Sequence, residues 1–231
     1  DIYSFGNLLP KKSEKLFRFY SLNLYNIESL LNHYFYLSNP FDFNDPFDCN
    51  INIIADNHNF GKLDNVKRNS YSNIGIAAFS EVIDNHLMWA HYTNNYNGFA
   101  LEFAGDGIQT NMNKNNINRY TLTKVIYPEI IKQIKKDYPF AEHYVFTTKM
   151  KNWSYEKEWR IIAQLETEDR GLEFLPECLK GIYIGHNIPD NNKSAYNLLL
   201  EIQEIKFPKV PVYVVYPHST ELKLEFEKVW N

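Results

Sequence analysis

The stretch EKEWRIIAQL, residues 156–165, alternates in the manner of a β-strand with two different faces. Trp159, Ile161 and Ala163 fall on one face, and Arg160 and Ile162 fall on the other. Similar short apolar or alternating runs stand on both sides of it along the chain, so strands are distributed over the whole sequence. We predict them at residues 16–20, 74–79, 98–103, 125–127, 180–188, 211–217 and 222–229.

Helical spacing and capping residues separate these strands. Asn23 precedes apolar residues at helical intervals, and Pro128 is suited to the first turn of a helix. Strands and helices do not alternate strictly, which favours an α+β fold with a mixed, largely antiparallel sheet and helices packed against it. No stretch of the sequence is a linker long enough to mark a domain boundary, so we expect one domain spanning residues 1–231. The predicted helices are residues 24–31, 84–95, 128–136, 140–151 and 190–205.

Composition limits the classes of function. Of the 231 residues, 44% are apolar and 16% aromatic, enough to fill a core, and the net charge of −4 comes without a basic stripe. Duplex-binding proteins are therefore disfavoured, and nucleic acid remains only as a locally recognised substrate. Cys49 and Cys178 lack metal or disulfide spacing, so we expect reduced thiols in the cytoplasm and no metal. No apolar run is long enough to predict a membrane span.

The motif WSYEKEWR, residues 153–160, is the first candidate site. Strand alternation puts Glu156, Glu158 and Arg160 on one face, flanked by aromatic residues that could wall a pocket. A carboxylate there could hold a ribose hydroxyl or stabilise a cationic transition state, while Arg160 contacts a phosphate. The alternative interpretation is a solvated ladder of ion pairs on an edge strand.

The second candidate combines FSE at residues 79–81 with MWAHY at residues 88–92. A strand end would deliver Ser80 to the start of a helix that carries Trp89, His91 and Tyr92. We expect these side chains to contribute to a nucleotide site. Ser80 could instead be a cap, and His91 a buried histidine with ordinary hydrogen bonds.

Two further groups of residues could bind a ligand. Arg18 on an early strand could meet a phosphate, and Tyr20 could stack on a base. Asp45 and Asp48 lie in the loop NDPFD, where they could bind a metal, although turn formation alone explains their presence.

The order of several motifs resembles a bacterial family known as domain of unknown function 2971. The motifs are LFRFYSL (16–22), LSNPFDFNDPFDC (37–49), FSE (79–81), MWAHY (88–92), GFALEF (98–103) and WSYEKEWR (153–160). The resemblance implies an accessory or effector protein of mobile and anti-phage regions, with a partner protein encoded in a defence operon.

A looser similarity is to ADP-ribosyltransferases, which have a basic residue or His on an early strand, a Ser or Tyr on a second strand and a Glu on a later strand. Arg18, Ser80 and Glu158 have that order here, whereas FSE replaces the Ser-Thr-Ser core of many such enzymes. The similarity implies NAD as substrate and a protein or nucleic acid as acceptor. Glu158 would be catalytic, Arg18 would bind the phosphates and Ser80 would support the nicotinamide ribose. Glu156 remains an alternative to Glu158.

Three hypotheses of function follow. The first is a toxin or anti-phage effector that uses NAD as a transferase or a hydrolase, in which Glu158→Gln should abolish turnover with little loss of stability. The second is a metal-dependent nuclease that uses Asp45, Asp48, Glu156 and Glu158. The third is a module that binds a nucleotide or a partner protein and catalyses nothing.

Overall fold

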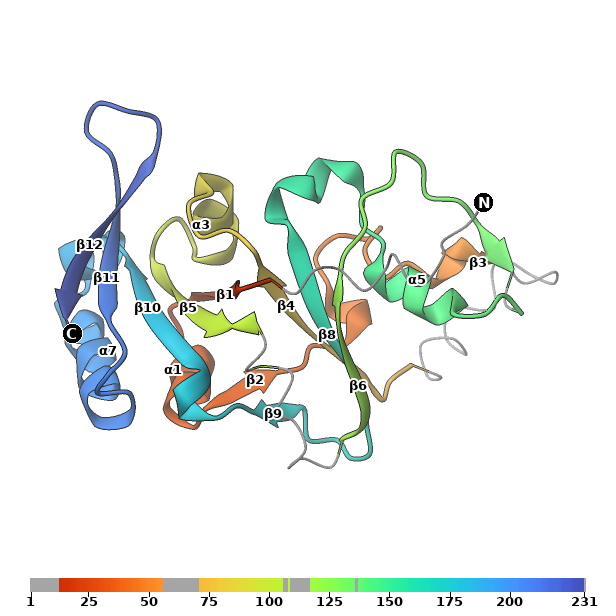
Figure 1. Ribbon diagram of the computed structural model, residues 1–231, viewed down its shortest axis with the longest axis horizontal. Coiled ribbons are helices and arrows are strands. Elements are labelled where there is room, and N and C mark those ends of the chain that lie inside the picture. Colours follow the sequence, from red (N-terminus) through yellow and green to blue (C-terminus); the bar gives the residue numbers. More distant parts are fainter. Residues whose placement is uncertain (1–12, 56–70, 106–107, 109–116, 136, 231) are drawn as a thin grey trace. The chain divides into compact units, whose positions relative to one another are not determined.

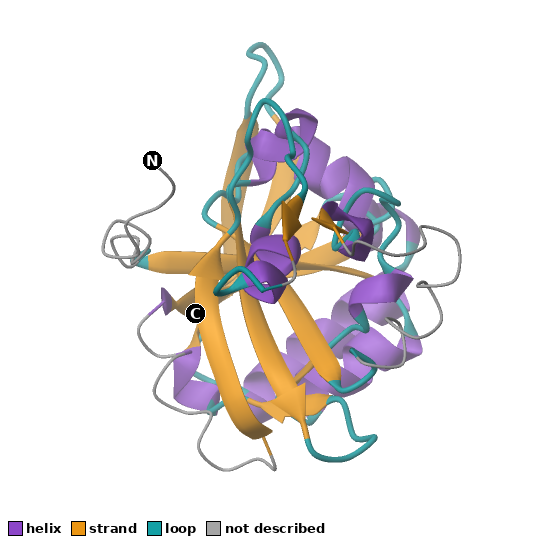
Figure 2. Ribbon diagram, turned by 90° about the vertical axis from the view of Figure 1, so that its right-hand side faces the viewer, coloured by secondary structure: helices purple, strands orange, loops and turns teal. Residues whose placement is uncertain are grey.

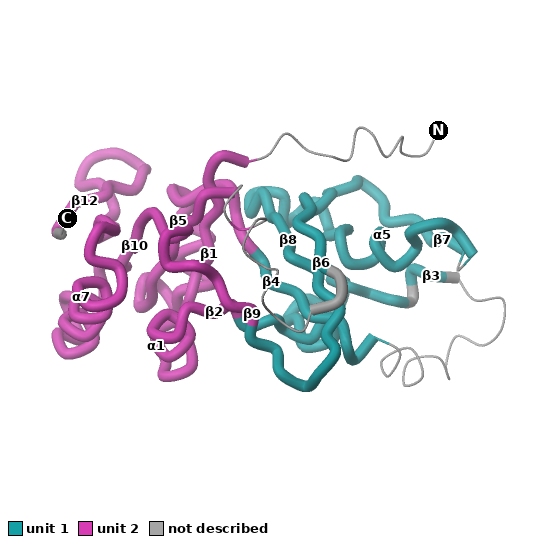
Figure 3. The backbone as a smooth tube through the Cα atoms, turned by 60° about the horizontal axis from the view of Figure 1, so that its bottom comes forward, with its two compact units in different colours: residues 1–10, 36–78, 115–171 teal, residues 11–35, 79–114, 172–231 magenta. Residues whose placement is uncertain are grey.

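The chain divides into two compact units, each built from segments that are distant in sequence (Figure 3). Unit 1 contains residues 36–78 and 115–171, and unit 2 contains residues 11–35, 79–114 and 172–231. From the sequence alone, one domain is expected. The computed structural model describes residues 13–55, 71–105, 108, 117–135 and 137–230.

Unit 2 contains a five-stranded arrangement in the order β12-β11-β10-β5-β1. Strands β10 and β11 are parallel, and the other neighbours are antiparallel. In the β1–β5 register, Arg18 lies opposite Leu101 and Phe17 opposite Glu102. The strands are β1 (Lys15–Ser21), β5 (Gly98–Ala104), β10 (Leu179–Gly185), β11 (Val212–Pro217) and β12 (Leu224–Trp230).

Helices pack beside the strands of unit 2 (Figure 1), and Figure 2 shows helices in purple and strands in orange. Asn23 caps α1 through a bond of 2.9 Å from the Asn26 amide to its side chain, as predicted. Trp89 of α3 is fully buried against Phe17, Ala100 and other core residues. The helices are α1 (Leu24–Leu31), α3 (His86–Tyr92), η6 (Pro176–Cys178), α6 (Asn187–Asn191) and α7 (Lys193–Lys206), and the short strands β2 (Tyr34–Tyr36) and β9 (Gly171–Glu173) pair with each other.

Unit 1 contains the strand order β4-β8-β6 and a short parallel pair, β3 with β7. Strand β4 belongs to both units, because its residues 79–80 lie in unit 2, where Ser80 pairs with Phe17. The elements are η2 (Pro40–Asp42), η3 (Ile51–Ile53), β3 (Ile54–Ala55), β4 (Ile74–Ser80), β6 (Ile117–Lys124), β7 (Ile134–Lys135), α5 (Ala141–Thr147), η5 (Lys151–Glu156) and β8 (Glu158–Leu165).

The predicted α+β class, with a mixed and mostly antiparallel sheet, is confirmed. Two local predictions are wrong. Residues 125–127 do not form a strand beyond one bridge at Ile126, and of the helix predicted over residues 128–136, the described residues 128–135 are not helical. Instead Ile134 pairs with Ile54 and packs on the core of unit 1, so tertiary contacts override the local preference. No helix in the described part of the chain is long and apolar enough to cross a membrane.

Candidate functional site

Five charged side chains of unit 1 form one buried ionic cluster, consisting of Asp48, Lys149, Glu156, Glu158 and Arg160. The ammonium nitrogen of Lys149 lies 2.6 Å from a Glu156 oxygen, 3.1 Å from a Glu158 oxygen and 3.5 Å from an Asp48 oxygen. Because charges are seldom buried without partners, this convergence explains how each carboxylate is tolerated in the interior.

Arg160 is the most deeply buried member of the cluster, with no exposed surface. Its guanidinium donates two parallel bonds to Asp48, of 2.6 and 2.8 Å, and a bond of 2.6 Å from Nε to Glu158. A further bond of 3.0 Å reaches the carbonyl of Phe146, and the ring of Phe43 covers the guanidinium at 5.3 Å. This bidentate geometry is the strong form of the arginine–carboxylate contact.

The cluster draws on four parts of the fold. Glu158 and Arg160 stand two positions apart on β8 and therefore share a face, as the alternation predicts. Glu156 ends η5, and Lys149 follows α5. Asp48 comes from the NDPFD loop, whose turn is closed by the Phe47 amide donating to Asp45 at 2.9 Å.

The electrostatic environment favours the charged forms of Glu158 and Lys149. Burial alone would raise the pKa of Glu158, but Arg160 and Lys149 lower it from 4.5 to about 2. Burial would lower the pKa of Lys149, but Glu158, Glu156 and Asp48 raise it. Three carboxylates and two cations leave a formal charge of −1, so the cluster favours positive charge nearby.

The structure excludes the solvated ladder on an edge strand, because Glu158 is only 4% exposed and β8 lies between β4 and β6. Of the four carboxylates considered for a nuclease, Asp48, Glu156 and Glu158 converge, but on the Lys149 ammonium. Within the described ranges, no group of three His, Cys, Asp or Glu residues could hold a metal ion.

In unit 2, Arg18 and Ser80 lie on opposite faces of neighbouring strands. The guanidinium of Arg18 lies among the rings of Tyr20, Phe35 and Phe79, at 5.4 to 5.8 Å. Ser80 pairs with Phe17, the neighbour of Arg18 in sequence, so its side chain projects from the other face. Its hydroxyl group bonds to Val82 at 3.1 Å and so forms a local turn.

The remaining predicted binding residues of unit 2 have different environments. Trp89 is a core residue whose indole N–H donates a hydrogen bond of 2.7 Å to the Ile83 carbonyl. Tyr20 is buried and stacks on Phe99 at 5.1 Å. His91 is exposed, which rules out the buried histidine, and its ring contacts that of Tyr92. A nucleotide site formed by these residues stays a prediction.

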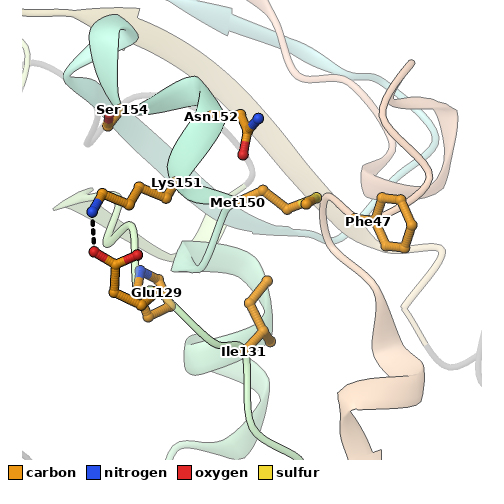
Figure 4. Close-up of a pocket in the computed structure, with 8 residues that line it drawn as sticks. Phe47, Glu129, Ile131, Met150, Lys151, Asn152 and Ser154 are labelled. Carbon is orange, nitrogen blue, oxygen red and sulfur yellow. Dashed lines mark hydrogen bonds and ion pairs between the residues drawn. The ribbon is translucent and has the colours of Figure 1, made fainter.

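Two cavities open in unit 1, of about 970 Å³ and about 480 Å³. Both volumes fall in or near the range of small-molecule sites, roughly 300–1,000 Å³. Pro128 lines both cavities. The larger is lined by Thr123, Lys124, Ile126, Pro128, Ile130, Lys132, Gln133, Ile134, Lys135, Asp137, Tyr138, Pro139, Phe140, His143, Tyr144 and Thr147. The smaller is lined by Phe47, Pro128, Glu129, Ile131, Met150, Lys151, Asn152 and Ser154 (Figure 4).

The larger cavity and the ionic cluster lie on the same face of the β6–β8 pair. Thr123, which lines the cavity, is directly opposite Arg160 in the strand register. Thr147, also in the lining, follows Phe146, whose carbonyl accepts a bond from Arg160. The cluster is therefore next to the cavity wall.

Comparison with known proteins supports the family resemblance. Residues 88–161 match a family described as Protein of unknown function (DUF2971). The matched segment includes the motifs MWAHY, GFALEF and WSYEKEWR, the whole lining of the larger cavity and every member of the ionic cluster except Asp48. No curated protein and no solved structure matches the chain.

Sequence reasoning missed Lys149 and the lysines of the larger cavity. Nothing in TTKMKNW distinguishes Lys149, which is buried, from Lys151, which is exposed. The aromatic and basic residues of 132–144 could have indicated the cavity. They were not recognised as its lining because residues 128–136 were predicted to form a helix.

Proposed function

We propose that the protein binds a nucleotide in the larger cavity of unit 1 and consumes NAD, either as an ADP-ribosyltransferase or as an NAD hydrolase. The lining of this cavity carries the proposal. It brings three lysines, Lys124, Lys132 and Lys135, together with aromatic residues in a space of about 970 Å³.

Each part of a nucleotide has a matching group in this lining. Lysine ammonium groups bind phosphates as point charges. Tyr138 and Phe140 are exposed at the cavity, where their rings can stack on a base. Burial lowers the pKa of His143, so its imidazole is neutral near pH 7 and can exchange hydrogen bonds with a ribose.

The ionic cluster supplies the electrostatic part of the proposal. Loss of nicotinamide from NAD leaves positive charge on the ribose, and a fixed negative charge in a water-poor site stabilises such a transition state. Glu158, with its pKa of about 2, remains ionised at neutral pH. Glu158 is only 4% exposed, so it does not contact the ligand directly in this arrangement. It acts through its electric field in the cavity and by accepting a hydrogen bond that positions Arg160.

We place this activity in a toxin or anti-phage effector of the bacterial cytoplasm, with a protein or nucleic acid as acceptor and a partner protein from a defence operon. The order of the motifs along the chain, through the family resemblance it carries, motivates this assignment. Growth arrest on expression of the protein, with a fall in cellular NAD, is the expected result.

Binding is tested by calorimetric titration of NAD and ADP-ribose into the protein. Replacing Lys132 and Lys135 with Glu should weaken both ligands at least tenfold, because two phosphate-binding charges are reversed. The matched control replaces Lys180 and Lys209, exposed lysines of unit 2, with Glu and should bind as the wild type does. Equal affinity in both variants would disprove the assignment of the cavity.

Turnover is tested by measuring nicotinamide release from NAD, with and without cell extract. Release without extract indicates a hydrolase, and release that needs extract and labels a macromolecule indicates a transferase. Lys132→Glu with Lys135→Glu should remove either activity. Activity that persists in this variant would contradict the proposal.

The burial of Glu158 favours a second candidate function, a nucleotide-binding module without catalysis. A carboxylate saturated by Arg160 and Lys149 cannot directly contact a ribose unless the cluster opens. Saturable NAD binding with no nicotinamide released, alone or with extract, would establish this alternative.

A further inference from the structure

The smaller cavity of unit 1 has an aromatic and apolar end. The Met150 side chain extends toward Phe47, and Ile131 also lines the cavity (Figure 4). Phe47 is 54% exposed and Met150 is 36% exposed, although both are large apolar side chains. An exposed ring that faces a thioether across an open cavity is suited to a flat aromatic ligand.

The other end of the cavity is polar. Lys151 and Glu129 form an ion pair there, and both side chains are largely exposed (Figure 4). An exposed pair of this kind contributes little to stability, so an anionic ligand can displace the glutamate from the lysine at small cost. The Asn152 side chain, with one amide donor group and one acceptor, also lines the cavity.

The buried ionic cluster holds the apolar end in place. Phe47 directly precedes Asp48, which receives two bonds from Arg160, and Met150 directly follows Lys149, which contacts three carboxylates. The backbone on both sides of the cavity is therefore anchored within one residue of the ring and the thioether. A site organised in advance loses less entropy when its ligand binds.

We propose that the smaller cavity is a second binding site, specific for a nucleoside monophosphate group. The base inserts between Phe47 and Met150, Asn152 contacts the edge of the base, and Lys151 exchanges Glu129 for the phosphate. This site adjoins the larger cavity, with which it shares Pro128, and the proposal does not depend on NAD turnover.

The test uses methyl resonances of methionine, because the chain has only three Met residues. The full chain, labelled with ¹³C at the methionine methyl groups, is titrated with adenosine monophosphate. Lys132→Glu with Lys135→Glu serves as the background, so that the larger cavity binds the nucleotide at least tenfold more weakly. We expect the Met150 signal, assigned with Met150→Leu, to shift through the ring current of the base. Met88, buried in unit 2, is the internal control.

Two comparisons make the result specific. Phe47→Ala should weaken binding roughly tenfold, the effect of losing one stacking ring, and Lys151→Ala should weaken the monophosphate more than adenosine. Ribose 5-phosphate, which lacks a base, should leave the Met150 signal in place. The proposal fails if Met150 is unmoved by millimolar adenosine monophosphate, or if ribose 5-phosphate shifts it equally.

Discussion

Arg160 is a buried cation with two carboxylate partners, so its replacement should destabilise the folded protein. Replacing it with Met removes the charge while keeping a long side chain, and leaves Asp48 and Glu158 with Lys149 as their remaining cation. We expect a loss of about 3–5 kcal/mol in the free energy of unfolding, measured by urea denaturation.

Lys151→Met is the control for this measurement, since the Lys151–Glu129 pair is exposed. Its expected cost is below about 1 kcal/mol. Similar costs for the two variants would show that the Arg160 contacts add no more stability than a surface pair.

Glu158 adds a dependence on pH. Since its pKa is lowered from 4.5 to about 2 in the folded protein, its contribution is complete above pH 4.5 and disappears as the pH falls toward 2. Glu158→Gln should therefore cost on the order of 3 kcal/mol at pH 7 and much less near pH 2. This differs from the sequence-based expectation of nearly unchanged stability.

The measurement is the difference in unfolding free energy between wild type and Glu158→Gln from pH 7 to pH 2.5. Glu166→Gln, at an exposed position just beyond β8, is the matched control and should show no such trend. A difference that stays constant with pH would contradict the ionic role of Glu158.

At the scale of elements, Arg170 connects two segments of unit 1 through the hydrogen bonds of its guanidinium. Its guanidinium donates to the carbonyls of Leu37 and Ile74, each at 2.6 Å, and to that of Ser72 at 3.2 Å. Arg170 thereby connects the start of β4 to the segment around Ser38, which forms a β-bridge with Ile76 of β4.

Removing the hydrogen bonds of Arg170 should destabilise the β-bridge between Ser38 and Ile76. Arg170→Ala is expected to cost roughly 2 kcal/mol and to speed hydrogen exchange at the Ser38 and Ile76 amides. Arg170→Lys keeps the charge but not the fork of donors, so it should restore only part of the protection. Unchanged exchange in Arg170→Ala would show that the bridge is stable without it.

Elements with a strong local pattern were predictable from sequence, and those shaped by distant contacts were not. The strand at 158–165 and the helix capped by Asn23 follow from alternation and capping. The helix predicted over residues 128–136 failed because β3, about 80 residues away, pairs with Ile134. The face shared by Glu158 and Arg160 was predictable, but the lysine that completes their cluster was not.

At the scale of the whole molecule, the proposed nucleotide site predicts where protection will appear. Adding NAD should slow amide hydrogen exchange in residues 123–135 and 137–147, which line the larger cavity. Residues 15–21 and 79–92 of unit 2, which contain Arg18 and Ser80, should be unaffected if these residues do not bind the nucleotide. Peptide-level mass spectrometry measures both regions, and protection restricted to unit 2 would move the site there.

The interleaved composition of the two units has a consequence for synthesis on the ribosome. Unit 1 needs residues 36–78 together with 115–171, and unit 2 needs its first residues together with those after 172. Neither can be completed as a contiguous nascent segment, so the usual order in which an N-terminal domain folds before the next is made cannot apply. The early apolar strand β1 therefore stays unpaired on the ribosome until β4 and β5, its two neighbours in the sheet, have been translated.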